Sequence, residues 1–209
     1  MEIATFGWDV ESMAFASIIG FVILGTIGII AQIWKIRRYR SGESVSVTWM
    51  GLRFFFLLAA AIYGLEIADP ALLVQGITRS VFVLPVMILL YRHKGFTERE
   101  WRILFASLII ICGMMQSAHQ ASYYLLLSYV NVVGSFSQPV EMYRNKSRGA
   151  LSFLMILTFT LNSFCWGVYG YASEQFVLVW MSVPFMIVFS ITLILWVYYR
   201  KNGVDSLSA

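Results

Sequence analysis

Long apolar runs separated by short polar segments organise most of this chain. A run of about 20 predominantly apolar residues is typical of a helix that crosses a lipid bilayer. One run, at 103–140, is long enough for two spans with a turn between them. The runs are Met13–Ile33, Val47–Leu65, Ala71–Tyr91, Ile103–Val140, Gly149–Ser173 and Gln175–Tyr199. The pattern therefore predicts an all-α integral membrane protein with seven transmembrane helices.

Composition agrees with this prediction and narrows it. Of the 209 residues, 59% are hydrophobic and 12% are charged, whereas a soluble domain carries about a quarter charged residues. Seven spans leave almost no chain for a soluble domain, so the lipid bilayer is the expected surrounding. Short loops and the absence of a targeting signal favour a prokaryotic inner (plasma) membrane.

The basic residues predict the orientation. When the loops are assigned alternately to two sides, thirteen of the fifteen Lys and Arg residues fall on one side, and none falls in the opposite loops. The positive-inside rule places that side in the cytoplasm. The N-terminus is then outside and the C-terminus cytoplasmic. The net charge of +4 follows from this topology, and we expect no nucleic-acid partner.

The sequence offers little material for a metal or a redox centre. Cys112 and Cys165 both lie within predicted spans, and His93 and His119 are far apart in the sequence. This spacing predicts neither a disulfide framework nor a zinc site. We expect no cofactor and no metal.

An internal repeat relates the two halves of the chain. The stretch "AQIWKIRRYRSGESVS" at 31–46 and the stretch "SQPVEMYRNKSRGALS" at 137–152 share Gln, Arg, Ser and Ser at the same four places, at an offset of 106 positions. At the same offset Gly28 matches Gly134, and "IYG" ending at Gly64 matches "VYG" ending at Gly170. No gap is needed across this range, which favours duplication over chance.

The repeat unit is three helices, and this number determines the topology. Three is odd, so a second copy joined directly would be inverted in the membrane. A linker helix between the copies restores the orientation that the charges require. We therefore expect residues 1–95 to form the first three-helix bundle, 96–120 the linker helix and 121–209 the second bundle with a short tail. Transporters built from parallel repeats bind substrate near the midplane between them.

Two motifs resemble a known family. "Q-x(8)-S-x(4)-S", which occurs after the first and the fifth predicted helix, looks like the PQ-loop motif. "KSRGALSFLMILTFTLNSFCWGVYGY", at Lys146–Tyr171, resembles the second repeat of the SWEET (MtN3/saliva) sugar transporters. The resemblance implies a 3+1+3 fold, pocket positions at Asn162 and Trp166, and gating or hinge positions at Gln32, Gln138 and Pro139. Members of the family often assemble into homo-oligomers, and the sequence leaves the oligomeric state of this chain open.

The sequence departs from the family at positions that matter for the solute. Ala31 and Ser137 replace the proline of the PQ pair, and Ser152 replaces a hinge proline. The two family asparagines that hold sugar hydroxyls fall near Ser182 and near Gln75. The resemblance therefore implies the fold and leaves the solute open.

Arg79 is the least expected residue in a transmembrane helix. It lies eight residues into the third predicted helix, about 12 Å below the outer surface. An arginine near the bilayer centre costs about 2.5 to 3.5 kcal/mol on insertion scales, so it needs a cavity or a partner. Gln75, at i−4, projects from the same helix face. Arg79 could be paired with a backbone carbonyl or an acidic residue, or it could face a substrate carboxylate or phosphate.

Other polar residues fall at matching depths. Counting along the sixth predicted helix places Asn162 at the depth of Arg79 and Trp166 at the depth of Gln75. The alternatives are a helix-packing hydrogen bond for Asn162 and an interfacial position for Trp166. Asn131, near the middle of the fifth predicted helix, is a further substrate-binding candidate.

Three other groups of residues receive structural interpretations. Arg53 lies close enough to the cytoplasmic side for its long side chain to reach the interface. Gln32 and Gln138 are each expected to close a helix and to satisfy backbone groups freed near a kink. Gly20, Gly25 and Gly28 are expected to allow close helix packing.

These features favour a membrane transporter that moves a small polar or anionic solute by alternating access. The alternative is a membrane receptor of the same architecture that binds a carboxylate or another anionic ligand without moving it. We do not expect an enzyme, because the sequence shows no acid pair, no nucleophile–base set and no metal cluster.

Overall fold

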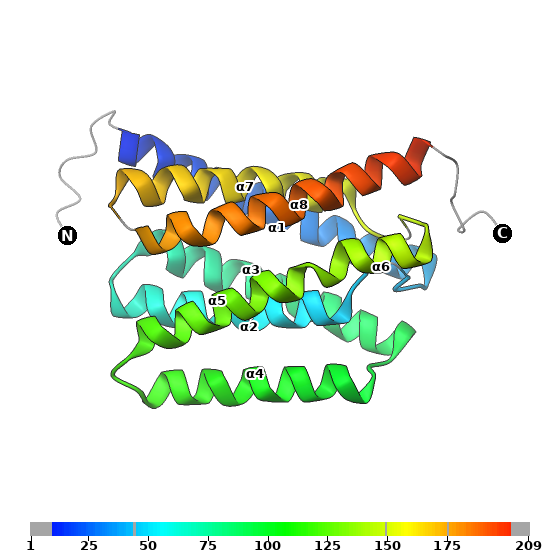
Figure 1. The fold of residues 1–209 in the computed structure, drawn as a ribbon, viewed down its shortest axis with the longest axis horizontal. Helices are drawn as coiled ribbons and strands as arrows, with labels where there is room; N and C mark the ends of the chain where they lie inside the picture. Colours follow the sequence, from blue (N-terminus) through cyan, green and yellow to red (C-terminus); the bar gives the residue numbers. More distant parts are fainter. Residues whose placement is uncertain (1–9, 44, 149, 175, 202–209) are drawn as a thin grey trace.

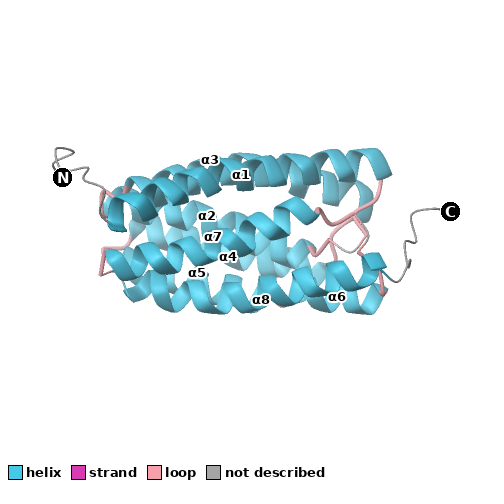
Figure 2. Cartoon of the chain, turned by 90° about the horizontal axis from the view of Figure 1, so that it is seen from above, coloured by secondary structure: helices cyan, strands magenta, loops and turns pink. Residues whose placement is uncertain are grey.

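The computed structural model describes residues 10–43, 45–148, 150–174 and 176–201, and in these residues the regular structure is entirely helical. The helices run side by side along the long axis of the molecule (Figures 1 and 2). They are α1 (Val10–Tyr39), α2 (Val47–Glu66), α3 (Pro70–Lys94), α4 (Glu98–Gln116), α5 (Gln120–Ser135), α6 (Ser137–Asn145), α7 (Phe153–Ala172) and α8 (Phe176–Lys201).

Five stretches are long and apolar enough to cross a membrane. They are Phe15–Tyr39, Val47–Glu66, Pro70–Lys94, Phe153–Ala172 and Leu178–Arg200. Helix α4 begins with a charged turn, and α5 is only 16 residues long. However, α5 continues almost directly into α6 (Figure 1), with only Phe136 between them. Together α5 and α6 form the fifth of the seven predicted helices.

Pro139 explains why the fifth helix is broken. Proline has no backbone N–H, and its ring crowds the carbonyl four residues earlier; here that carbonyl belongs to Ser135, the last residue of α5. The Ser137 hydroxyl donates a hydrogen bond to the carbonyl of Gly134 at 2.6 Å, which supplies a partner to a backbone group at the break. α1 continues without a break through the matching region, where Ile33 replaces the proline.

Helix starts are set by local capping residues. Asp69 precedes α3, and its carboxylate accepts hydrogen bonds from the backbone N–H groups of Ala71 and Leu72, while Pro70 occupies the first helical position, where no N–H is needed. Thr97 and Glu100 form a reciprocal capping box at the start of α4.

Two helix groups face each other. The first helix group is α1, α2 and α3; the second is α5, α6, α7 and α8. Within the first, α3 packs against α1 and α2, and within the second, α8 packs against α5, α6 and α7. Between the groups, α1 packs against α7 and α2 against α5. Helix α4 packs on α2 and α5 at the periphery (Figure 1).

The molecule has two distinct ends. We call the end where α2, α4 and α7 finish the short-turn end, and the end where α1, α3 and α6 finish the basic end; they lie at the left and right of Figure 1. Basic side chains occupy the last turns of α1, α3 and α6.

Two glycines matched by the repeat allow close contact between the groups. A Cβ on Gly28 would lie 2.8 Å from the Cα of Met155 in α7, and a Cβ on Gly134 would lie 2.1 Å from a methyl carbon of Leu52 in α2. The packing prediction for the α1 glycines is wrong for Gly20, because a Cβ added there would have nothing within 4 Å. Gly20 faces away from the other helices.

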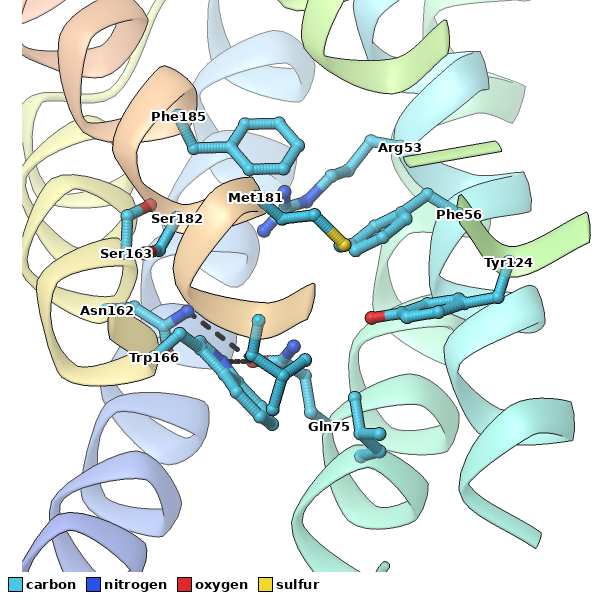
Figure 3. A pocket seen from close by; sticks show the side chains of 12 residues that line it. Arg53, Phe56, Gln75, Tyr124, Asn162, Ser163, Trp166, Met181, Ser182 and Phe185 are labelled. Carbon is cyan, nitrogen blue, oxygen red and sulfur yellow. Dashed lines mark hydrogen bonds between the residues drawn. The ribbon is translucent and has the colours of Figure 1, made fainter. Parts of the chain in front are cut away.

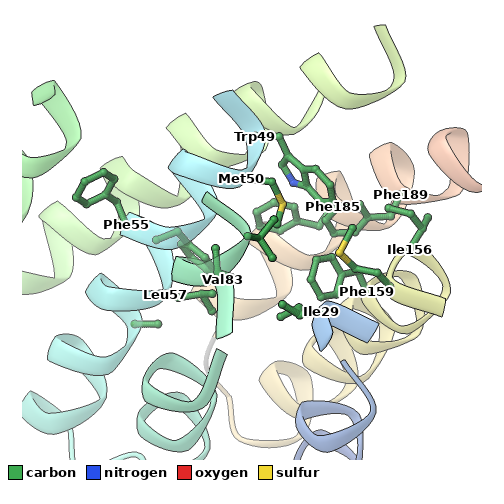
Figure 4. Packing of buried hydrophobic residues seen from close by; sticks show 14 of the residues in the cluster. Ile29, Trp49, Met50, Phe55, Leu57, Val83, Ile156, Phe159, Phe185 and Phe189 are labelled. Atoms are coloured by element: carbon green, nitrogen blue, oxygen red, sulfur yellow. The ribbon is translucent and has the colours of Figure 1, made fainter. Parts of the chain in front are cut away.

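Buried aromatic rings fill the space between the groups on the basic side of the centre. Trp49 meets Phe159 at a ring-centroid distance of 6.1 Å and Phe189 at 6.0 Å. Figure 4 shows these rings beside Phe185 and Ile156. Because α2 contributes Trp49 while α7 and α8 contribute its partners, this cluster joins the two helix groups.

Candidate functional site

Four of the five substrate-binding residues predicted from the sequence meet in one buried cluster. The Gln75 Oε1 atom in α3 accepts hydrogen bonds from Trp166 Nε1 at 2.8 Å, Arg79 Nη1 at 3.2 Å and Asn162 Nδ2 at 3.4 Å. Arg79 Nη2 also donates to Asn162 Oδ1 at 3.2 Å. The cluster therefore links α3 of the first helix group to α7 of the second.

Arg79 is fully buried and held by protein acceptors. Its relative exposure is 0%, and its Nη2 donates to the backbone carbonyl of Phe21 at 2.5 Å as well as to Asn162. A Cβ on Gly25 would lie 2.3 Å from that nitrogen. Gly25 therefore makes room for the guanidinium, a role that the glycine pattern alone did not reveal.

The network fixes the orientation of the Gln75 amide. Oxygen and nitrogen of a side-chain amide are assigned from their hydrogen-bond partners, and three donors converge on Oε1 of Gln75. The Nε2 group, with its two N–H donors, is then left for the cavity that Gln75 lines. Figure 3 shows Gln75 with its bonds to Asn162 and Trp166.

A small cavity of about 40 Å³ lies beside this cluster. Helices of both groups line it, mostly with aromatic and aliphatic side chains and with a smaller polar set. Its apolar lining is Phe56, Leu72, Tyr124, Trp166, Leu178, Met181 and Phe185, and its polar lining is Arg53, Gln75, Asn162, Ser163 and Ser182. An apolar cavity with few polar groups is typical of a small-molecule site.

The repeat places this cavity between equivalent positions. Three pairs of lining residues, each separated by 106 positions, come one from each helix group: Leu72 and Leu178, Gln75 and Met181, and Phe56 and Asn162. The backbone is thus repeated around the cavity, but the side-chain chemistry is not. In the last two pairs, the polar residue of one helix group is equivalent to an apolar residue of the other.

Arg53 is the functional candidate that the sequence reasoning missed. Its side chain does not reach the interface as expected: it is 4% exposed and lines the cavity. The guanidinium lies 4.7 Å from the centroid of the Phe159 ring and 5.6 Å from those of Phe56 and Phe185. Figure 3 shows Arg53 with Phe56 and Phe185. The aromatic surroundings hold Arg53 inward by cation–π attraction. Depth along the helix was correct, but depth does not reveal which way a side chain turns.

Two predicted substrate-binding residues do not line the cavity. Arg79 lies behind Gln75 and Asn162, and the cavity walls do not include it. Asn131 is fully buried on α5, and within the described part of the chain neither polar atom of its amide has a hydrogen-bond partner. The structure therefore places Arg79 in contact with two wall residues and leaves the role of Asn131 a prediction.

Gln32 and Gln138 bind the opposite helix group rather than their own helix end. Gln32 Oε1 accepts a hydrogen bond from Ser152 N at 2.8 Å, and Gln138 Oε1 accepts one from Ser46 N at 2.9 Å. These bonds are equivalent under the repeat. Gln32 lies inside α1 and Gln138 at the start of α6, so the expectation that each closes a helix is wrong. We call this pair of contacts the glutamine latches.

Further contacts close the two ends of the molecule. At the basic end, Lys94 of α3 forms an ion pair with Glu141 of α6, and the hydroxyl groups of Ser46 and Ser137 are 2.6 Å apart. At the short-turn end, the Tyr169 hydroxyl donates to Asp69 Oδ2 at 3.3 Å. Polar contacts thus join the helix groups at both ends and at the level of the buried cluster.

Metal binding finds no support in the described part of the chain. No group of three or more His, Cys, Asp or Glu side chains comes together there. The cavity instead offers hydrogen-bond donors, a buried cation and aromatic faces, which suit the non-covalent binding of a small molecule.

Comparison with known proteins finds a family and a solved structure that resemble this chain. Residues 125–203, from α5 through α8, match a family model described as "Sugar efflux transporter for intercellular exchange". The second half of the chain is thus similar to the SWEET family. Among solved structures, a eukaryotic SWEET transporter at 3.7 Å resolution matches with a TM-score of 0.55 and 18% sequence identity, over 91% of this chain and 100% of that one. No curated protein matches the sequence.

The SWEET-like fold confirms the predicted all-helical membrane architecture. It extends the likeness beyond residues 125–203, the segment that matches the family model, to nearly the whole chain. The match of residues 125–203 to a transporter family model supports a membrane transporter.

Proposed function

We propose that this protein is a SWEET-like transporter that moves a small polar or anionic solute through the membrane by alternating access between the two helix groups. The observation that carries the proposal is the buried cluster of Gln75, Arg79, Asn162 and Trp166 beside a cavity that both groups line. A site divided between two repeats changes its exposure when one repeat moves against the other.

The contacts between the groups provide for such a motion. The α1–α7 and α2–α5 interfaces are the surfaces that would slide. The glutamine latches and the Lys94–Glu141 pair close the basic end, and the Asp69–Tyr169 contact closes the short-turn end. In our proposal one set opens while the other stays closed. The basic end faces the cytoplasm, in accordance with the positive-inside rule.

The cluster of Gln75, Arg79, Asn162 and Trp166 is expected to favour solute binding. Three donors on one oxygen leave the Gln75 amide rigid, and Arg79 keeps Asn162 in place behind the cavity wall. A preorganised polar wall lowers the cost of binding because little ordering remains when the solute arrives. We propose that Gln75, Asn162 and Trp166 contact the solute while Arg79 positions them.

A two-stage experiment tests this function. A thermal-shift panel of neutral sugars, nucleosides, carboxylates, phosphates and lipid headgroups, run on detergent-purified protein, first identifies a stabilising solute. Counterflow of that solute is then measured in proteoliposomes. We expect saturable counterflow in wild type and its loss in Asn162→Ala. Binding without flux through correctly inserted protein would contradict the transporter and support the receptor alternative.

A further inference from the structure

The Arg53 guanidinium is a buried cation that the protein leaves available. It lines the cavity, and within the described residues no hydrogen bond or ion pair holds it; its Nε is buried without a partner. Arg79, by contrast, donates to Gln75, Phe21 and Asn162. Of these two buried arginines, Arg53 is therefore the one that no described residue holds by a hydrogen bond, and it can bind a ligand.

A second buried cation lies nearby. The Phe159 ring has the Arg53 guanidinium 4.7 Å and the Arg79 guanidinium 5.5 Å from its centroid. No aspartate or glutamate is among the described residues that line the cavity. Asp69, the acidic residue at the start of α3, is occupied by the N–H groups of Ala71 and Leu72 and by Tyr169. Two positive charges thus share one low-dielectric region, and the described residues that line the cavity supply no counter-charge.

The other hydrogen-bonding groups of the cavity include both donors and acceptors. Gln75 presents Nε2 donors to the cavity because its oxygen is occupied. The Ser163 and Ser182 hydroxyls donate to the backbone carbonyls of their own helices, so toward the cavity their oxygens can only accept. A carboxylate or phosphate needs donors and positive charge, which Gln75 Nε2 and Arg53 supply, so it is the buried charge that favours an anion over a neutral polyol.

Resting on the proposed function, we infer that the solute is a small organic anion whose carboxylate or phosphate lies beside Arg53 and Gln75. Its apolar body lies against the rings of Phe56 and Tyr124, which form the apolar wall, with Trp166 across the cavity from them (Figure 3). Tyr124 stacks on Phe56 at a centroid distance of 5.7 Å, so this wall is rigid. The asymmetry of the repeat gives the solute one charged and one apolar end.

Arg53 also explains how the ligand would be selected. In the repeat, position 53 corresponds to Phe159, so only one half of the cavity carries this charge. An anion supplies the missing counter-charge, and its release from water is offset by bonds to the guanidinium fork. A neutral molecule of the same shape supplies no counter-charge to Arg53 and therefore binds more weakly.

Benzoate and benzamide provide a matched pair of probes, since both have one aromatic ring and differ chiefly in charge. Binding is measured by calorimetry on detergent-purified wild type, Arg53→Gln, Arg53→Lys and Arg102→Gln, with phenyl phosphate and glucose as further ligands. Arg102 is the control because its side chain is 73% exposed on α4. Benzoate and phenyl phosphate distinguish the two anionic groups.

We expect wild type to bind an anion at least tenfold more tightly than benzamide. Arg53→Gln is expected to abolish this preference, Arg53→Lys to retain part of it, and Arg102→Gln to leave it unchanged. Equal affinity for benzoate, phenyl phosphate and benzamide in wild type would overturn the inference even if Arg53→Gln failed to fold. So would an anion preference that persists in folded Arg53→Gln.

The result also separates this inference from the proposed function. If glucose binds and shows counterflow while both anions fail to bind, the protein is a transporter and the anion site is wrong. If an anion binds with the expected dependence on Arg53 and shows no counterflow, the anion site stands and the transporter is wrong.

Discussion

At the scale of single residues, the candidate site depends on small side chains that make room for large ones. Gly25 allows the Arg79 guanidinium to reach Phe21 and Asn162, and a Cβ there would lie 2.3 Å from Nη2. The buried arginine and the glycine on a neighbouring helix therefore form one structural unit.

Replacing Gly25 with alanine is expected to displace the Arg79 guanidinium and to weaken at least one of its buried hydrogen bonds. The expected loss is about 1–3 kcal/mol of stability, the cost of an unsatisfied buried polar group. Thermal unfolding in detergent measures it. Gly20→Ala is the matched control on the same helix, because it has nothing within 4 Å of the added atom. Equal melting temperatures for the two variants would contradict this account.

Trp166 tests the convergence of donors on Gln75. Trp166→Phe removes one of the three hydrogen bonds to Oε1 while keeping an aromatic wall. We expect solute affinity to fall about fivefold, as for the loss of about 1 kcal/mol. Trp180→Phe, at a side chain that is 72% exposed, should bind like wild type. A Trp166→Phe protein with unchanged affinity would remove Trp166 from the site.

The sequence allowed the buried cluster to be predicted because helix geometry converts residue counts into depth. Arg79 and Asn162 fall at one level and Gln75 and Trp166 at the next, and the structure brings all four together. Arg53 was misjudged because a residue count gives no azimuth: its direction is set by Phe159 and Phe185, which lie more than 100 positions away in the sequence.

At the scale of helices, the two halves are joined by reciprocal contacts that a single copy could not make. Each glutamine of the repeat binds the start of the second helix in the opposite group, at Ser152 or Ser46. The motif itself could be read from the sequence, but its partner could not, because the partner lies in the other copy. The break at Phe136 was also only partly predictable. The sequence marked Pro139 as a hinge candidate, but it did not give the residue at which the helix breaks.

Gln32→Leu is expected to loosen the basic end. The substitution removes the amide that accepts from Ser152 N and donates to the Ala150 carbonyl. Each of these backbone groups, if it stays buried without a partner, destabilises the protein by about 1–3 kcal/mol. We expect faster reaction of a membrane-impermeant thiol reagent with Ala150→Cys in this background, with Cys112 and Cys165 replaced by serine. Gln116→Leu, an exposed glutamine at the short-turn end, serves as the control. Labelling that is as slow as in the control would show that the latch does not close this end.

At the scale of the whole molecule, the repeat explains both the symmetry of the backbone and the asymmetry of the site. Equivalent positions surround the cavity, yet the repeat pairs polar residues with apolar ones: Gln75 is equivalent to Met181, and Asn162 to Phe56. In our proposal, two copies of one helix unit allow the motion, and their divergence gives the site a charged and an apolar side. Motion of the groups against each other is the central claim of this account.

A reversible cross-link at the basic end tests that claim most directly. The Ser46 and Ser137 hydroxyl oxygens are 2.6 Å apart and belong to opposite helix groups, so Ser46→Cys with Ser137→Cys is close enough for a disulfide. Counterflow of the solute found by the thermal-shift panel is measured in a background with Cys112 and Cys165 replaced by serine. The account predicts that oxidation abolishes counterflow, that reduction restores it, and that Ser46→Cys alone is unaffected. Counterflow that continues when mass spectrometry shows complete cross-linking would contradict alternating access between the two groups.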